Sequence, residues 1–254
     1  MTQTSRPGAT TRAIGLIPVR LESSRLPRKA LADIGGLPMI VHVVKRAQMS
    51  CSLDDVYVAT DSTEVRDVVL AHGGDVIMTS PEHQTGSDRI AEAARSLECD
   101  VVVNIQGDEA LVRPEHIDAA VASMRDPEVV ISMLVIPYFK NGITSDIKVV
   151  LDERNNILYQ SRADIPSDAR TSQPPRYKAY HVVSFRKPFL MKYADWTASA
   201  LERIEFIEYL RVLEKGYSIR AVHVDSDAIS VDTLSDLTYV RGAMSRDDLF
   251  RKYA

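Results

Sequence analysis

Residues 13–31 read AIGLIPVRLESSRLPRKAL, an apolar run that leads directly into a loop rich in cations. The run at 13–18 is typical of a buried strand. A second apolar run, DVVVNI at 100–105, is followed in the same way by the polar sequence QGDE. Strands that are apolar on both faces indicate a parallel sheet covered by helices on both sides, and such sheets bind ligands where their strands end. The two segments therefore predict an α/β fold with a site at that edge of the sheet.

The first half of the chain alternates short apolar runs with amphipathic stretches. We expect further strands at 56–60 and 75–78. The spacing of the apolar residues, together with Pro38 and Pro114, predicts helices that start near residues 38, 63, 87 and 114. This alternation predicts a doubly wound, mostly parallel sheet.

The pattern changes after Val129, where longer strands follow one another and Asn155-Asn156 suits a hairpin turn. We expect residues 129–185 to form a small β-rich lobe that serves acceptor binding or dimer contact. Farther along, residues 201–213 predict amphipathic helices, and 218–224 predict a strand that closes the sheet. The apolar face of these helices consists of Leu201, Ile204, Ile207 and Leu210.

The composition is that of an ordinary globular chain of 254 residues, with 45% hydrophobic and 26% charged side chains. We expect a flexible N-terminus at 1–12 and a single domain over 13–254. The net charge of −4 argues against a nucleic-acid partner. No apolar run approaches the roughly 20 residues that span a bilayer, and residues 1–12 lack the apolar core of a signal peptide. We therefore expect a cytoplasmic protein without membrane contact. Cys51 and Cys99 lack ligand spacing, which argues against a thiolate metal site.

Four cations stand in the loop that follows the first strand: Arg20, Arg25, Arg28 and Lys29. Because this loop lies where open α/β sheets bind ligands, the cations favour a polyanionic ligand. Neither GxGxxG nor GxxxxGK[ST] occurs in the chain, so a dinucleotide fingerprint and a P-loop are excluded as their explanation. A solvated basic loop is the alternative.

The strand end at 106–109 brings Gln106, Gly107 and Asp108 to the same edge of the sheet. A carboxylate beside a phosphate-binding loop indicates Mg²⁺, which one or two protein carboxylates hold together with phosphate oxygens. Asp232, in the sequence VDTLSDL, is the candidate for a second ligand. Alternatively, Asp232 or Thr233 simply caps the last helix.

The segment HQTGSDR at 83–89 places Thr85, Gly86 and Ser87 before a predicted helix. A glycine between small hydroxyl side chains lets a base or ribose approach the backbone closely. An ordinary N-capped helix start explains the same residues equally well.

Taken together, these segments resemble the 3-deoxy-manno-octulosonate (Kdo) cytidylyltransferases, which are CMP-sugar synthetases with a nucleotidyltransferase fold of the GT-A-like kind. The family's motifs are a PxRxxSxRLPxKxL loop, a TDxxxV strand end, an HxSGTDR-like segment, a QGDEP strand end and a late VDTPxDL. They correspond here to residues 18–31, 60–65, 83–89, 106–110 and 231–237. The helix that starts at Leu201 also fits the family.

The resemblance implies that an acceptor acid attacks the α-phosphorus of CTP, that pyrophosphate leaves and that Mg²⁺ is the cofactor. It also implies a homodimer. The implied catalytic residues are Arg20, Arg25, Lys29, Gln106 and Asp108. The implied nucleotide contacts are Arg20, Lys29, Thr85, Gly86, Ser87, Gln106 and Gly107. Asp108 and Asp232 would hold the metal.

The departures from the family concern the acceptor. Where Kdo enzymes have a sequence like RHLGIYGYR, this chain has KAYHVVSFR at 178–186, which places Ala179 and Val183 at the family's sugar-contacting His and Tyr. Loss of two hydroxyl partners, together with the extra cations Arg28 and Arg113, favours a small, highly charged acceptor such as a phosphonate, for example phosphonoformate. His181 lies two positions from Ala179 and therefore on the same face of a strand, so a Kdo-like acceptor is the alternative.

The candidate acceptor contacts are Arg25, Arg28, Gln106, Arg162, His181 and Glu205. The sequence assigns no specific role to Glu202 or Glu205. A catalytically silent nucleotide-binding regulator on the same fold is the alternative from another functional class.

Overall fold

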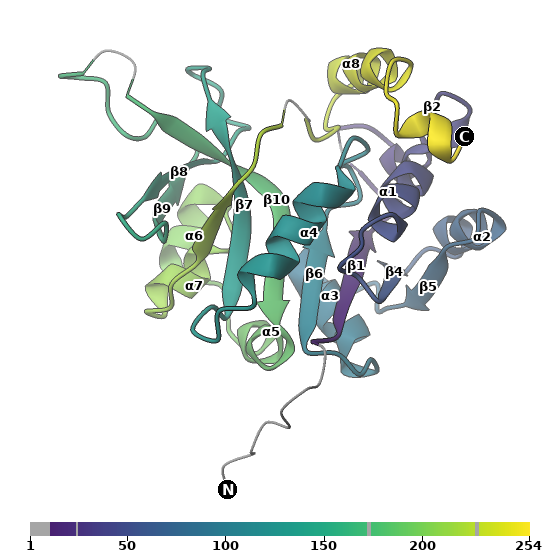
Figure 1. Ribbon diagram of the computed structural model, residues 1–254, viewed down its shortest axis with the longest axis horizontal. Coiled ribbons are helices and arrows are strands. Elements are labelled where there is room, and N and C mark those ends of the chain that lie inside the picture. Colours follow the sequence, from purple (N-terminus) through teal and green to yellow (C-terminus); the bar gives the residue numbers. More distant parts are fainter. Residues whose placement is uncertain (1–10, 24, 172–173, 227–228) are drawn as a thin grey trace, which may run out of the picture.

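The computed structural model describes residues 11–23, 25–171, 174–226 and 229–254. Its centre is a nine-stranded sheet, and the expected doubly wound α/β fold is confirmed (Figure 1). The spatial order along the sheet is β11 (Arg220–His223), β7 (Ile131–Tyr138), β10 (Arg176–Arg186), β6 (Val101–Ile105), β1 (Ala13–Val19), β4 (Asp55–Thr60) and β5 (Asp75–Met78). Neighbours along this path are parallel except at β10, which is antiparallel to both β6 and β7.

Helices cover both faces of the sheet. One face packs against α1 (Met39–Gln48), α2 (Thr63–Ala71), α4 (Pro114–Ser123) and α8 (Leu234–Met244). The other face packs against α3 (Gly86–Arg95), α5 (Lys187–Ala194), α6 (Ala200–Glu205) and α7 (Leu210–Glu214). The remaining short elements are η1 (Lys29–Leu31), the hairpin of β2 (Asp33–Ile34) and β3 (Leu37–Pro38), and η2 (Phe250–Lys252).

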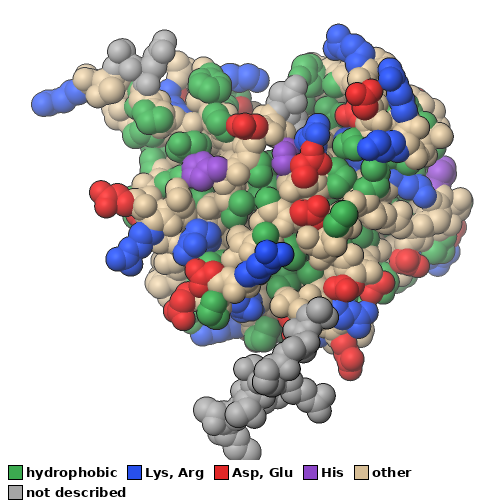
Figure 2. Space-filling view, in the orientation of Figure 1, with side chains coloured by type: hydrophobic (Ala, Val, Ile, Leu, Met, Phe, Trp, Pro, Cys, Tyr) green, Lys and Arg blue, Asp and Glu red, His purple; other side chains and the backbone are tan. Residues whose placement is uncertain are grey.

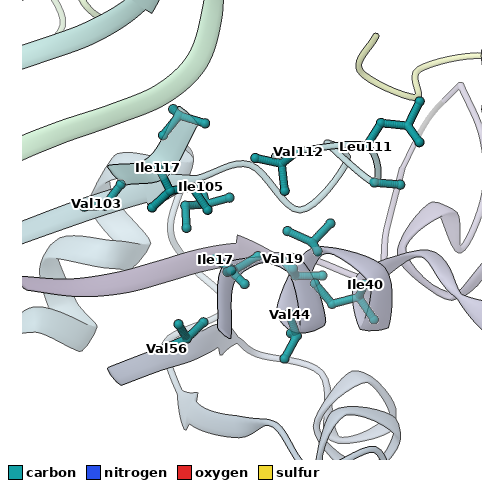
Figure 3. Packing of buried hydrophobic residues seen from close by; sticks show 14 of the residues in the cluster. Ile17, Val19, Ile40, Val44, Val56, Val103, Ile105, Leu111, Val112 and Ile117 are labelled. Atoms are coloured by element: carbon teal, nitrogen blue, oxygen red, sulfur yellow. The ribbon is translucent and has the colours of Figure 1, made fainter. Parts of the chain in front are cut away.

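The core explains why the strand sequences are apolar throughout. Successive side chains of a strand point to opposite faces, and all seven residues of β1 are buried. Ile17 and Val19 pack with residues of α1 and α4 such as Ile40 and Ile117 (Figure 3). Ile14 and Leu16 belong to the cluster on the other face. Each face therefore removes its own set of apolar side chains from water.

The order of the strands positions the site. From β1 the chain passes to β4 and β5 on one side, and it then returns to β6 on the other side of β1. The loops that leave β1 and β6 therefore start beside each other at a topological switch point. Gly107 is required there, because a Cβ atom at this position would lie 2.7 Å from Val19 Cγ2 and 3.2 Å from the Pro18 oxygen.

The predicted β-rich lobe is only partly separate from the sheet. Strands β7 and β10 are internal strands of the main sheet, and only the hairpin of β8 (Lys148–Leu151) and β9 (Ile157–Ser161) stands off it. The eleven-residue β10 joins the two parts, because its residues 177–178 pair with β8 and its residues 182–186 pair with β6. A register shift between Tyr180 and Val183 interrupts its pairing with β7. The predicted hairpin turn is confirmed by Asn155, whose φ is +59°.

The apolar helical face expected over 201–213 is interrupted. Phe206 has a φ of +54° and ends α6, so the following residues turn away from its axis. Ile204 is consequently 73% exposed, whereas Ile207 and Leu210 are buried. A left-handed residue breaks the helical periodicity on which that prediction rested.

The expected flexible N-terminus lies mostly outside the described residues. Arg12, which is described, is held in place: its backbone N–H donates to Asp100 at 2.8 Å, and its side chain pairs with Asp55. Within the described ranges, no helix combines the length and the apolar character needed to cross a membrane. Acidic and basic side chains are interspersed over the face seen in Figure 2.

Candidate active site

Two adjoining cavities, of about 310 Å³ and about 680 Å³, open where β1 and β6 end. The smaller is lined by the loop after β1, by residues 83–86 and by the loop after β6. The larger extends from there to β10, to the loop before β8 and to the segment after α6. Six residues line both cavities, and all six are candidates from the sequence: Arg25, Thr85, Gly86, Gln106, Asp108 and Asp232. A group bound in one cavity would meet a group bound in the other against these side chains.

Lys29 connects two carboxylates at the junction of the cavities. Its Nζ lies 2.7 Å from Asp108 Oδ2 and 3.2 Å from Asp232 Oδ1, and Arg25 lies 2.9 Å from the same Asp232 oxygen. Burial alone would lower the pKa of Lys29, but the charges and hydrogen bonds of Asp108 and Asp232 outweigh it and raise the pKa. Lys29 is therefore cationic, and two carboxylates face the same point.

This donor set fits a divalent cation. The last helix is capped by Thr233, whose Oγ1 accepts from the Asp236 N–H, so the Asp232 side chain is free to face Asp108. In the part of the chain that the structure describes, no cluster contains three or more His, Cys, Asp or Glu ligands. A metal here would thus depend on the two aspartates together with ligand oxygens, which is the usual arrangement for Mg²⁺ at phosphates.

The smaller cavity contains the expected polyanion-binding residues. Arg20 is exposed and makes no hydrogen bond or ion pair with a described residue. Thr85 lines the cavity and also caps α3, because its Oγ1 accepts from the Asp88 N–H at 3.1 Å. The helix-cap interpretation is therefore confirmed, and the nucleotide contact of the same side chain stays a prediction.

Arg89 is a cavity residue to which the sequence reasoning assigned no role. It is 4% exposed, its guanidinium donates to Thr79 Oγ1 at 2.6 Å, and it lies 3.2 Å from Asp61 Oδ1. It thereby ties α3 to the ends of β4 and β5 beside the smaller cavity.

Ser87 does not line either cavity. It is fully buried, and its hydroxyl donates to Glu208 Oε1 at 3.0 Å. Glu208, which the sequence reasoning missed, lines the larger cavity, and its Oε2 is buried without a hydrogen-bond partner among the described residues. Burial raises the pKa of this carboxyl. Glu208 thus presents an unpaired carboxyl oxygen to whatever enters the cavity.

Gln106 is held between the two cavities by a chain of hydrogen bonds. Its amide donates to Asn104 Oδ1 at 3.2 Å, and the Asn104 amide donates to the Tyr209 hydroxyl at 3.0 Å. Asn104 and Tyr209 are buried. Two buried side chains, Asn104 and Tyr209, therefore hold the Gln106 amide in position.

Two of the three β10 residues in the acceptor argument line the larger cavity. Ala179 and His181 both line the larger cavity, and so does Tyr180 between them, so the lining does not follow the two-residue period of the strand. Burial lowers the pKa of His181. Val183 packs in the core on the face of the sheet that α3 and α5 cover, and it lines neither cavity. Only one of the two lost sugar contacts therefore affects this cavity.

Three other candidates are engaged elsewhere. Arg28, with a φ of +56°, pairs with Glu64 at the start of α2. Glu205 accepts from the Ser161 hydroxyl at 2.7 Å and from the Arg162 N–H at 3.0 Å. Arg162 lines the larger cavity, but its guanidinium donates to backbone oxygens of residues 144, 145, 205 and 206. Arg28 and Glu205 line neither cavity, so the structure does not place them at the acceptor.

The extra cations that the sequence-based argument placed at the acceptor do not add free positive charge to the larger cavity. Arg113 pairs with Glu115 outside it, and the cavity-lining Lys178 donates to Asp146 at 2.9 Å. Its lining also contains more carboxylates than basic side chains. The side-chain partners of the cations, which the sequence did not reveal, account for the difference.

Comparisons with known proteins identify the family. Residues 14–219 match the Cytidylyltransferase family. The 3-deoxy-manno-octulosonate cytidylyltransferase of Koribacter versatilis is 41% identical, and the match covers 91% of this chain and 89% of that protein. The protein of the same name from Chlorobium phaeobacteroides is 42% identical, with coverages of 91% and 96%.

Solved structures give the same result. The structure of CMP:2-keto-3-deoxy-manno-octonic acid synthetase complexed with CTP superposes with a TM-score of 0.90 at 36% identity, covering 93% of this chain and 99% of the other. The 4-diphosphocytidyl-2C-methyl-D-erythritol synthase of Anaerococcus prevotii, at 10% identity and a TM-score of 0.64, shares the fold; the match covers 93% of this chain and 97% of that one. From the strand-end motifs, the joined cavities and these matches, we conclude that the chain belongs to the cytidylyltransferase family.

Proposed function

We propose that this protein is a CMP-Kdo synthetase, which transfers CMP from CTP to a Kdo-like 2-keto-3-deoxy sugar acid and releases pyrophosphate. The observation that supports this most directly is the pair of cavities that share Asp108 and Asp232, the two partners of Lys29, at their junction. CTP would occupy the smaller cavity and the acceptor the larger one. The names of the two relatives favour Kdo as the acceptor.

In this reaction an acceptor hydroxyl oxygen forms a bond to the α-phosphorus, and the bond from that phosphorus to the oxygen bridging to the β-phosphate breaks. The hydroxyl proton passes to solvent. The electron pair of the broken phosphorus–oxygen bond leaves with pyrophosphate. Such a transfer depends on positioning and on charge stabilisation more than on covalent catalysis.

The residues of this chain have separate tasks in the proposal. Arg20 and Arg25 bind phosphate oxygens, and Lys29 lies closest to the group that is transferred. Gln106, positioned by Asn104, orients the acceptor beside the nucleotide. Thr85, Gly86 and Gly107 leave room for the cytidine.

Asp108 and Asp232 would hold Mg²⁺. When bound, this ion neutralises phosphate charge and favours departure of pyrophosphate. Without it, Lys29 neutralises the two carboxylates. Ligand binding would therefore redistribute the contacts of Lys29 between the aspartates and the phosphates.

The larger cavity favours a hydroxyl-bearing acceptor over a compact trianion. The buried Glu208 oxygen has no partner among the described residues, and a hydroxyl of the acceptor can form a hydrogen bond with it. His181 offers a polar ring beside Ala179, while Arg28 is engaged outside the cavity. These contacts support Kdo, the alternative that the sequence left open, in place of a phosphonate.

A homodimer is also proposed. Four large apolar side chains are exposed around the β8–β9 hairpin, α6 and the end of β7: Phe139, Leu158, Ile204 and Phe206, with exposures of 61–91%. We infer that these side chains contribute to one interface, because large exposed apolar patches mark sites of protein contact. Light scattering coupled to size-exclusion chromatography tests this assembly.

The function is tested by one competition assay. The enzyme is incubated with labelled CTP, Mg²⁺ and equimolar Kdo and phosphonoformate, and the CMP adducts are separated. We expect CMP-Kdo to predominate. Predominant CMP-phosphonoformate would contradict the acceptor assignment, and no pyrophosphate release with any acid would instead support the silent regulator.

A further inference from the structure

Asp232 lies just before α8, in a connection whose described residues 229–233 form no strand, whereas Asp108 lies three residues after the end of β6. A carboxylate in such a connection needs cross-links if it is to face Asp108 at a constant distance. Besides the ion pairs of the Asp232 carboxylate with Lys29 and Arg25, two cross-links hold the described residues just before Asp232, and both involve the pair of residues 108–109.

The first cross-link is made by the backbone. The Val231 N–H donates to the Asp108 carbonyl oxygen at 3.1 Å, and the Val231 side chain is fully buried. This bond fixes the distance of Val231 from the loop that follows β6. By itself it leaves rotation about the bond free.

The second cross-link is made by side chains. The Ser230 hydroxyl donates to Glu109 Oε1. Because Glu109 and Ser230 are the neighbours of Asp108 and Val231, the two bonds together fix both the position and the orientation of the chain just before Asp232. On its other side, the Asp232 N–H donates to Asp236 Oδ2 at 3.1 Å.

Burial of the Glu109 carboxyl lowers the stability of the fold, so packing alone does not explain this residue. It is 1% exposed, and its Oε2 has no hydrogen-bond partner among the described residues. Burying a carboxylate with so few donors costs stability. A residue that packs without charge would cost less, so the observed bond to Ser230 is the informative feature of this side chain.

We propose that Glu109 is a positioning residue, which acts through Ser230 to hold Asp232 opposite Asp108 as a ligand for the metal. The inference rests on the proposed function of the two aspartates. Partners of metal ligands typically change metal affinity by about 10- to 100-fold when removed. Loss of the Ser230 hydroxyl should therefore weaken metal binding without removing either aspartate.

The test measures Mn²⁺ directly. Free Mn²⁺ is quantified by electron paramagnetic resonance in the presence of a non-hydrolysable α,β-methylene analogue of CTP. Ser230→Ala should raise the dissociation constant for Mn²⁺ about tenfold, while metal-free binding of the analogue stays unchanged. Ser230→Thr and Glu109→Gln keep a donor and an acceptor, respectively, and should bind Mn²⁺ like the parent protein.

Ser245→Ala is the matched control, because Ser245 lies at the end of α8 and its hydroxyl bonds only within that helix turn. Equal Mn²⁺ affinity of Ser230→Ala and the parent protein would overturn the inference and leave the proposed function intact. An equal loss of metal-free analogue binding would also overturn it. If the parent protein itself bound no Mn²⁺, the metal assignment and the inference would both fail.

Discussion

Replacement of Glu202 by alanine should destabilise the protein strongly, although Glu202 is outside both cavities. Its carboxylate accepts from Arg211 Nη2 at 2.6 Å and from Nε at 2.8 Å, and it also accepts from the Ser199 N–H at 2.9 Å. The two side chains are only 10% and 5% exposed. The hydrogen bonding between Arg211 and Glu202 raises the pKa of Arg211, so the buried guanidinium stays protonated.

The size of the effect follows from these contacts. Removal of one partner of a buried ion pair typically costs about 3–5 kcal/mol, because the other charge is left uncompensated. The Arg211 guanidinium would keep its bond to the Trp196 oxygen and its position over the Tyr193 ring. We therefore expect a loss of about 4 kcal/mol, which for a chain of this size lowers the Tm by roughly 8–16 °C.

Denaturant unfolding and calorimetry measure this change. Glu202→Gln, which keeps part of the hydrogen bonding, should lose less, and Glu128→Ala is an exposed acidic control. Because Glu202 orders the segment that leads to Glu208, the KM for Kdo should rise in the variant while the KM for CTP changes little. A loss below about 1 kcal/mol would refute the reasoning, since it would show that Arg211 is adequately solvated without its partner.

The remaining predictions concern the site. Asp108→Asn should remove most metal-dependent turnover but weaken CTP binding only modestly, and near-normal turnover at sub-saturating Mg²⁺ would contradict the ligand assignment. Lys29→Ala should lower kcat more than CTP affinity, whereas an effect on affinity alone would make Lys29 a simple binding residue. Burial raises the pKa of Glu109 to about 7 from 4.5. Folding then takes up a proton between these values, so stability falls as the pH rises from about 4.5 to 7. Glu109→Gln should therefore gain up to about 3 kcal/mol over the parent protein at pH 8 and nothing at pH 4, as measured by urea unfolding at both pH values.

Much of the fold was predictable because it depends on local pattern. The bounds of α2 and β5 agree with the sequence expectation, since apolar spacing, Ser62 as an N-cap and Gly73 as a stop act within a few residues. The switch point was predictable for a similar reason. Two apolar runs that end in polar loops deliver those loops to one edge of a parallel sheet, and this predicted that Lys29 and Asp108 lie close together. Asp232 was a candidate only from the separate segment VDTLSDL.

The tertiary structure alone decided which side chains meet. The antiparallel insertion of β10 beside β6 depends on pairing between distant strands, and a strand's own periodicity does not specify its neighbour. Arg28 was expected at the acceptor, but it reaches Glu64 instead. Ser87 was expected at the nucleotide, but it donates to Glu208, 121 residues away. Local periodicity determines which residues face inward, but a buried polar group must find a partner in space, and only the packed fold determines which one it finds.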